Sequence, residues 1–432
     1  MILKEKITKN LLFQNIAVVA SGNIVAKLIV ILSTPIITRL YTPEDYGIFS
    51  IFLSITSLIG SLATLRYAVT IPIAREEKLA DNLLKLCFIV TVSLTIFWSI
   101  NIWLFGDYFT EKYSTQQLRP FLWIIPIVFL GQGIYEALNN WAIRDKKFKL
   151  ITQTKISQGV SSSLLKIGLG IIAITPLGLF IGKIAEIYAG IGSLLLKLLK
   201  VKPGFFKRNS WLEIKIAAKR YKKFPLVQSW SQLLLTLGGQ LPILLIGAFY
   251  GVKVVGVFGL AMGMINMPMD LIGKSVAQVF YAEISKYGKN NPQQIYDLSV
   301  SITKKLLLVS LIPVTILLFF GPWLFSTIFG AEWQEAGLYA RYFSMIVLTR
   351  FISSPTANIF NIFEKQGLQL FLNVVRTLLV ILIFYICHLM EYSASEAIIL
   401  YSIIFPLYSI ASLYINFNEI KRQITYVKLK RE

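Results

Sequence analysis

Long apolar segments recur along the whole 432-residue chain, and they restrict its fold more than any other feature. A helix that crosses the hydrocarbon core of a bilayer needs about 20 mostly apolar residues, with its backbone hydrogen bonds made inside the segment. By this criterion the sequence predicts an all-α integral membrane protein with about twelve transmembrane helices. The predicted spans lie near residues 12–38, 46–71, 81–105, 120–143, 151–174, 177–198, 225–249, 254–282, 305–328, 338–363, 368–388 and 395–417.

The composition supports a membrane protein. Apolar residues make up 55% of the chain and charged residues only 15%, whereas soluble domains carry about 25% charged residues. The net charge of +21 would suggest nucleic-acid binding in a soluble chain. Here the cations must first be placed relative to the spans, and we expect no nucleic-acid partner. Two cysteines in apolar segments and a single histidine predict no metal centre and no cofactor.

The segments between spans alternate in charge. Those that follow even-numbered spans hold many Lys and Arg residues, as do both termini, whereas those that follow odd-numbered spans hold few. Roughly 28 cations lie on one side of the predicted membrane and about 4 on the other. The positive-inside rule therefore places both termini in the cytoplasm.

A dense basic segment divides the spans six and six. It predicts an N-terminal six-helix bundle at 1–199, a basic cytoplasmic linker at 200–223, a C-terminal six-helix bundle at 224–418 and a basic cytoplasmic tail at 419–432. Trp211, Ile214 and Ile216 among the linker cations indicate an amphipathic helix on the inner membrane face. A charged loop that only sets the topology is the alternative.

The two halves carry a short internal repeat. A Tyr, a Gly and a Phe recur at an offset of 209 residues, where the first span of each half ends and the second begins: Tyr41, Gly47 and Phe49, then Tyr250, Gly256 and Phe258. Both copies begin a half from the cytoplasmic side, so the predicted repeat is parallel. Repeats of this kind place the substrate path between the halves.

The run from Leu32 to Phe49, Leu-Ser-Thr-Pro-Ile-Ile-Thr-Arg-Leu-Tyr-Thr-Pro-Glu-Asp-Tyr-Gly-Ile-Phe, resembles the signature of the polysaccharide transporter family. These are the Wzx-type flippases of lipid-linked O-antigen and capsule repeat units, in the multidrug/oligosaccharidyl-lipid/polysaccharide (MOP) exporter superfamily. The likeness continues through residues 63–67 and 82–84. It implies a V-shaped pair of six-helix bundles in the bacterial inner membrane, around a cavity that opens alternately to each side.

Five cations within the spans are candidates for binding an anionic cargo. A charge at the bilayer centre costs roughly 2.5–3.5 kcal/mol on insertion scales, so such residues indicate function. Their positions put Lys27 and Arg350 near the midplane, and Lys166 and Arg376 at moderate depth. The alternative partners of these four are helix carbonyls or a carboxylate of another helix. Arg66 lies near the cytoplasmic end of its span, where snorkelling to the headgroups is the alternative.

Two carboxylates are candidates for proton coupling. Glu136 is the one carboxylate that is expected to be buried and that lacks a basic partner nearby in sequence. The alternative is a salt bridge to a cation of another helix, namely Lys27, Lys166 or Arg66. Asp270 is the second candidate, if its pair with Lys274 four residues later is broken.

The excess of deep cations suits an anionic cargo, above all a pyrophosphate, with which Arg makes bidentate contacts. Polar and aromatic residues in the fourth, seventh and tenth spans suit an oligosaccharide, with interhelical polar contacts as the alternative. Together with the family resemblance, these features predict a flippase for undecaprenyl-pyrophosphate-linked oligosaccharide, in contact with lipid and with other polysaccharide assembly proteins. Its transport is coupled to H⁺ or Na⁺ or driven by the membrane potential.

Three other functions are consistent with a chain of this kind. A flippase for another lipid-linked precursor shares the same physical requirements. A multidrug exporter of the same superfamily is disfavoured, because exporters of organic cations should line their path with carboxylates. An integral polymerase or ligase is disfavoured as well, because the predicted outer loops are short and hold no histidine or paired catalytic set. We therefore expect a transporter and not an enzyme.

Overall fold

The computed structural model describes the backbone of residues 2–112, 115–206, 210–356 and 359–429. The side chains of residues 2–20, 268, 270–272, 274–275, 278, 282, 361 and 366 lie outside this description. Within the described residues the chain forms helices joined by short turns and has no strands. It divides into two compact units, Met1–Gln240 and Leu241–Glu432. The predicted linker at 200–223 falls inside the first unit, and the finer division into bundles, linker and tail stays a prediction.

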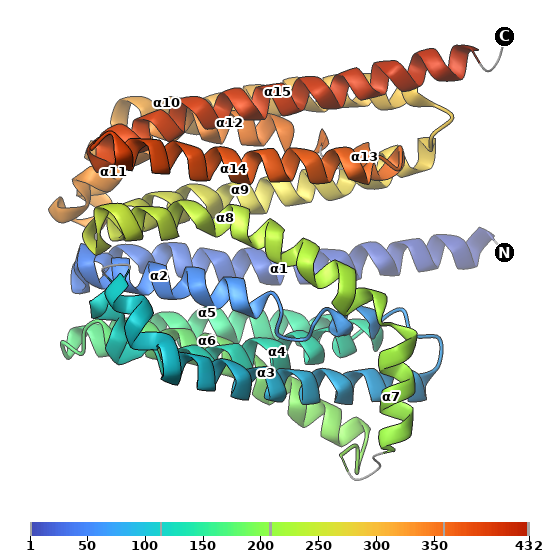
Figure 1. The fold of residues 1–432 in the computed structure, drawn as a ribbon. Helices are drawn as coiled ribbons and strands as arrows, with labels where there is room; N and C mark the ends of the chain where they lie inside the picture. The colour runs from blue at the N-terminus through green and yellow to red at the C-terminus, as the bar shows by residue number, and fades with distance from the viewer. Residues whose placement is uncertain (1, 113–114, 207–209, 357–358, 430–432) are drawn as a thin grey trace. The chain divides into compact units, whose positions relative to one another are not determined.

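The first unit is a bundle of long helices with one short helix at its end (Figure 1). Its helices are α1 (Ile2–Leu40), α2 (Pro43–Gly60), α3 (Glu77–Lys112), α4 (Ile124–Arg144), α5 (Phe148–Ile171), α6 (Leu177–Val201) and α7 (Trp211–Arg220). Part of its core is aromatic: the ring of Phe180 lies 4.4 Å from that of Phe121 and 4.8 Å from that of Phe52, measured between ring centroids. A π-helical turn at Phe224–Gln228 precedes α8 (Ser229–Tyr250), which runs across the boundary between the units.

The second unit combines long helices with a series of shorter ones. It contains α9 (Val252–Tyr287), α10 (Pro292–Phe329), α11 (Gln334–Tyr342), α12 (Ser344–Ser353), α13 (Ile359–Ile362), α14 (Gln366–Leu389) and α15 (Ala394–Leu429). A cluster of buried side chains from α9, α10, α13 and α15 includes Phe280, Ile295, Ile359 and Ile420. Helices far apart in sequence therefore share one core.

The helices have the length and surface of membrane-spanning segments. Seven helices in the described part of the chain are long and apolar enough to cross a bilayer. Large apolar side chains on these helices remain exposed, such as Leu32 at 72%, Trp103 at 83% and Phe319 at 66%. Exposed apolar area of this extent is costly in water and is suited to lipid. The predicted all-α membrane class is confirmed.

Two predicted spans are not continuous helices. The span expected at 46–71 breaks where α2 ends at Gly60; the chain then turns through 61–66 and forms a 3₁₀ helix at Tyr67–Thr70. The span expected at 338–363 is divided among α11, α12 and α13. Hydropathy does not reveal such breaks, because it measures how apolar a segment is and not the direction of its backbone.

The family-like run has a clear local role. Thr42 caps the start of α2: its hydroxyl accepts a hydrogen bond from the Asp45 N–H, and the Asp45 carboxylate accepts one from the Thr42 N–H. Such a capping box satisfies donors that a helix start leaves unpaired. The Tyr41 hydroxyl donates to the Lys166 carbonyl on α5 at 2.7 Å. In the second half, α8 ends at Tyr250 and α9 begins at Val252, so both copies of the repeat mark a turn between helices.

Candidate anion-binding and ion-pair sites

The second unit contains a polar cavity of about 300 Å³ between α12, α14 and α15. Arg350 of α12 and Arg376 of α14 both line it, so folding brings together two of the five predicted cations. The other lining residues are Ser353, Ser354, Phe360, Gln369, Leu372, Asn373, Phe405, Tyr408, Ser409, Ser412 and Asn416. None of these lining residues is acidic, so the cavity wall carries positive charge.

Helical periodicity explains how α14 and α15 form this wall. Residues three, four and seven positions apart lie on one face of a helix. The lining residues have this spacing on both helices: Gln369, Asn373 and Arg376 on α14, then Ser409, Ser412 and Asn416 on α15. Except for Arg376, sequence reasoning missed these residues. A polar stripe of helical period inside an apolar span was the signal that could have identified them.

The polar groups of the cavity are only partly hydrogen-bonded within the protein. The Nη1 atom of Arg350 has a partner, because it donates to the Asn266 Oδ1 atom of α9 at 2.9 Å. The Nε atom of Arg376 and the Oδ1 atom of Asn416 are buried and have no hydrogen-bond partner in the described part of the chain. Buried polar atoms in proteins are nearly always hydrogen-bonded. The two cations and the unused Arg376 donor suit an anion with oxygen acceptors, whereas the unused Asn416 oxygen can accept only from a donor such as a hydroxyl.

Arg66 and Glu136 form a second polar site, in the first unit. Arg66 follows the break in α2 and has a left-handed backbone, with φ 61°. Its Nη1 atom lies 3.8 Å from the Glu136 Oε1 atom of α4, and the Thr64 hydroxyl donates to the Glu136 Oε2 atom at 3.0 Å. The Thr91 hydroxyl of α3 donates to the Ala63 carbonyl in the same turn. Glu136 therefore lies beside Arg66, one of the three cations that the sequence offered as its salt-bridge partner.

Lys166 and Lys27 lie elsewhere in the first unit. The Nζ atom of Lys166 lies over the Phe49 ring, 5.1 Å from its centroid, and helix α5 also packs against α6. On α6, Lys183 and Glu186 lie three residues apart and form an ion pair at 2.7 Å. Lys27 is half-buried on α1, which packs against α5. The five predicted cations therefore occupy several places, and Arg350 and Arg376 share a cavity.

The remaining predicted residues concern coupling and metals. The side chains of Asp270 and Lys274 lie outside the described residues. No group of three or more His, Cys, Asp or Glu residues in the described part of the chain is placed to hold a metal ion. Cys87 and Cys387 are both buried and free. The assignment of the cations to cargo binding, and of Glu136 and Asp270 to proton coupling, stays a prediction.

Comparison with known proteins identifies a sequence family and a fold. The family model described as "Polysaccharide biosynthesis protein" matches residues 36–337. No curated protein matches the chain. The structure resembles an inward-facing multidrug resistance MATE transporter of the MOP superfamily, with a TM-score of 0.73 and 14% identity over 93% of this chain and 95% of that one.

Two further solved structures share the fold. An outward-facing MATE transporter of the MOP superfamily matches with a TM-score of 0.61 and 14% identity, over 96% of each chain. A MOP superfamily transporter from Pyrococcus furiosus, reported to have a binding pocket of reversed polarity, matches with a TM-score of 0.54 and 14% identity, over 96% of this chain and 94% of that one. At this identity the likeness concerns the fold, which is that of MATE and MOP transporters.

Proposed function

The chain belongs to the polysaccharide biosynthesis protein family, and from this membership we propose that it is a flippase for lipid-linked oligosaccharides. It is a membrane transporter and not an enzyme. It takes an undecaprenyl-pyrophosphate-linked repeat unit of O-antigen, capsule or exopolysaccharide from the cytoplasmic leaflet of the bacterial inner membrane. It delivers this unit to the outer leaflet by alternating access, with both termini of the protein in the cytoplasm.

The two-arginine cavity carries this proposal. A guanidinium group makes paired hydrogen bonds to phosphate oxygens, which a lysine ammonium does not reproduce. Arg376 has an unused buried donor, and the Ser, Asn and Gln side chains around it suit sugar hydroxyls. A cavity of about 300 Å³ is at the lower end of the size of ligand pockets. It therefore receives the phosphate end of the cargo, while the polyprenyl tail stays in lipid.

The membrane potential favours this direction of transport. An inside-negative potential drives an anion outward, and this movement releases about 2.3 kcal/mol per charge per 100 mV. A cationic site that moves together with the cargo reduces this gain. Coupling to H⁺ or Na⁺ then supplies the remainder, and Glu136 beside Arg66 is the proposed proton carrier in the described part of the chain.

A flippase for another lipid-linked precursor is the alternative, because the phosphate end of such a cargo has the same chemistry. An exporter of organic cations is disfavoured by the charge of the cavity. Its lining includes two arginines and no carboxylate, whereas an organic cation would require negative charge in the wall.

The test is complementation of a strain that lacks the gene. We expect the deletion to accumulate lipid-linked oligosaccharide on the cytoplasmic leaflet and to lose surface polysaccharide. Arg350→Ala and Arg376→Ala should restore export about tenfold less well than the unchanged protein, because each removes a charged hydrogen-bonding group. Arg376→Lys should remain impaired, because a lysine keeps the charge and loses the paired donors.

Arg119→Ala is the matched control. Arg119 pairs with Asp107, and both side chains are more than half exposed, at 57% and 60%; exposed pairs contribute little. Its membrane abundance and export should equal those of the unchanged protein. Full complementation by both cavity variants would contradict the assignment of the cavity as the cargo-binding site. A deletion strain with intact surface polysaccharide and no accumulated precursor would contradict the proposed flippase function itself.

A further inference from the structure

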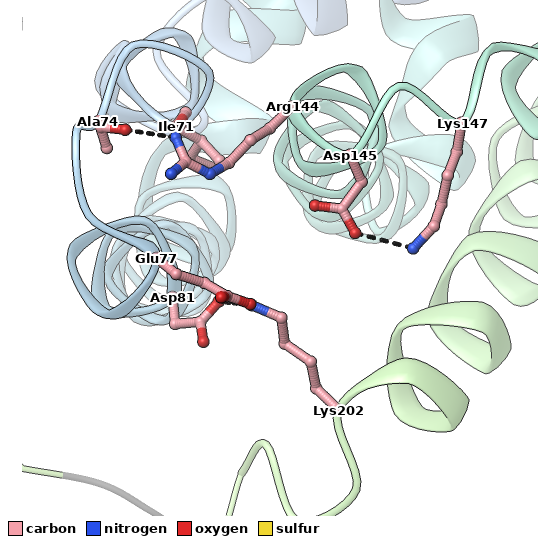
Figure 2. Close-up of polar contacts among 8 residues, drawn as sticks. All are labelled: Ile71, Ala74, Glu77, Asp81, Arg144, Asp145, Lys147 and Lys202. Carbon is pink, nitrogen blue, oxygen red and sulfur yellow. Dashed lines mark hydrogen bonds and ion pairs between the residues drawn. The ribbon is translucent and has the colours of Figure 1, made fainter.

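The segment after α6 is attached to the start of α3 by two sets of charged contacts. In the first, the Lys202 Nζ atom lies 3.0 Å from the Glu77 Oε1 atom and donates to the Asp81 carboxylate, as Figure 2 shows. In the second, Glu213 of α7 lies 2.5 Å from the Lys78 Nζ atom and accepts from the Asn82 Nδ2 atom at 3.1 Å. We call these contacts the linker clamp.

Apolar packing supports the linker clamp. α7 buries Ile214 and Ala217, which are 3% and 0% exposed, on the side that faces the bundle. The Tyr67 hydroxyl donates to the Ala218 carbonyl at 3.3 Å. In Figure 1 α7 runs crosswise to the long helices of the first unit, beside the start of α3. A ten-residue helix is marginal by itself in water, so these contacts are what fix its position and direction.

The clamp holds at neutral pH. Hydrogen bonds from Lys78 and then Asn82 lower the pKa of Glu213, so that its carboxylate stays ionised until the pH falls below the ordinary range of glutamate. Burial lowers the pKa of Lys202, but the hydrogen bonds to Asp81 and Glu77 outweigh this and raise the pKa overall. The Glu213 carboxylate stabilises the linker clamp only above its pKa, and the Lys202 ammonium stabilises it only below its own pKa. At neutral pH, which lies between these two values, both groups are charged and both stabilise the clamp.

The outer face of α7 is both apolar and cationic. Trp211, Leu212 and Ile216 are 68%, 68% and 56% exposed. The exposed cations on and just after the helix are Lys215, Lys219, Arg220, Lys222 and Lys223. Glu213 is the only carboxylate between residues 202 and 223, and the linker clamp already uses it. Five cations therefore lack a nearby compensating charge on their own segment.

We propose that α7 is an interfacial anchor that binds anionic phospholipid headgroups. Its axis lies crosswise to the long helices of the first unit, as required of a helix in the membrane plane. Tryptophan and aliphatic side chains beside cations suit the boundary between headgroups and acyl chains, and basic residues there attract anionic lipid. The linker clamp holds this face in place on the first unit. The anchor does not depend on what the protein transports.

The test places a fluorophore on the proposed lipid-facing surface. Full-length protein with Leu212→Cys is labelled with the fluorophore NBD, and labelling is selective because Cys87 and Cys387 are buried. Nanodiscs of phosphatidylcholine then receive a small fraction of acyl-chain spin-labelled phosphatidylglycerol or phosphatidylcholine. We expect the anionic quencher to be about threefold more effective, and this preference to vanish at 1 M salt, where charges are screened beyond about 3 Å.

Two variants test the two parts of the proposal. Lys215→Gln/Lys219→Gln/Arg220→Gln should bring the ratio of the two quenchers close to one, whereas the tail variant Lys421→Gln/Arg422→Gln/Lys428→Gln should keep the preference. Glu213→Gln, which weakens the linker clamp, should reduce quenching by both lipids. Equal quenching in the unchanged protein would overturn the selectivity for anionic lipid. Emission typical of water with no quenching would show that α7 faces solvent, and this would overturn the proposed anchor.

Discussion

At the scale of the residue, a charged side chain can find its partner on another segment of the chain. Glu136 has no basic neighbour along its own span, yet the turn after α2 places the Arg66 Nη1 atom 3.8 Å from the Glu136 carboxylate. Non-helical backbone at membrane depth is tolerated only where the protein covers it or where it lines a cavity. The hydrogen bond from Thr91 to the Ala63 carbonyl provides this cover. The turn after α2 therefore places a cation beside a carboxylate of another helix.

Glu136→Gln tests whether this carboxylate carries protons. The amide keeps the size and the hydrogen bond to Thr64 but cannot exchange a proton, so export should lose its dependence on the pH gradient. The measurement is export of lipid-linked oligosaccharide into the outer leaflet of vesicles with and without an imposed pH gradient. Glu111→Gln, at an exposed position near the end of α3, is the control and should keep the dependence. If export by Glu136→Gln kept its dependence on the pH gradient, Glu136 would not be the proton carrier.

At the scale of the element, small residues decide how closely the helices approach. α10 and α11 pack together where Gly321 and Gly337 face each other. A Cβ atom on Gly337 would lie 2.3 Å from the Gly321 carbonyl oxygen and 2.6 Å from the Pro322 Cα atom. Both are backbone atoms that cannot turn aside. Helices in lipid rely on such close packing, because no hydrophobic force drives them together there.

Gly337→Ala should therefore lower the stability of the second unit by about 1–3 kcal/mol, the usual cost of overpacking. Thermal unfolding in detergent, followed by tryptophan fluorescence, measures the change. Gly263→Ala is the matched control on α9, because its Cβ atom would meet no atom within 4 Å. It should be neutral or slightly stabilising, since alanine is the better helix former. An unchanged melting temperature for Gly337→Ala would show that α10 and α11 can separate freely.

At the scale of the whole molecule, the distribution of cations predicts the orientation. Of 43 Lys and Arg residues in the chain, most lie on segments expected on one side. We expect a green fluorescent protein fused after residue 432 to fluoresce, and alkaline phosphatase at the same point to be inactive, because both report a cytoplasmic terminus. Phosphatase inserted after Lys112, where α3 ends, should be active, because this segment is expected on the side of the membrane opposite to the termini. The reverse pattern would invert the orientation and, with it, the direction of transport that we propose.

Much of the architecture was predictable from the sequence, and the reason is the lipid. A chain in hydrocarbon must bond its backbone inside each segment, so apolar length alone indicated helices and their approximate places. The internal repeat at Tyr41 and Tyr250 was also a local signal, because it marked the turn before α2 and the turn before α9. The breaks at Gly60 and within 338–363 were not predictable, because apolar composition is the same on both sides of them.

The sequence by itself determined the membrane class, the family resemblance and the set of candidate charges, because these depend on composition and on neighbours along the chain. Only the tertiary structure decided which charges meet. Arg350 and Arg376 share one cavity, Arg66 reaches Glu136, and Lys202 holds the linker to α3. Each pair joins residues from separate segments, so its contact depends on how each helix is rotated and packed against its neighbours, which no spacing along the chain expresses.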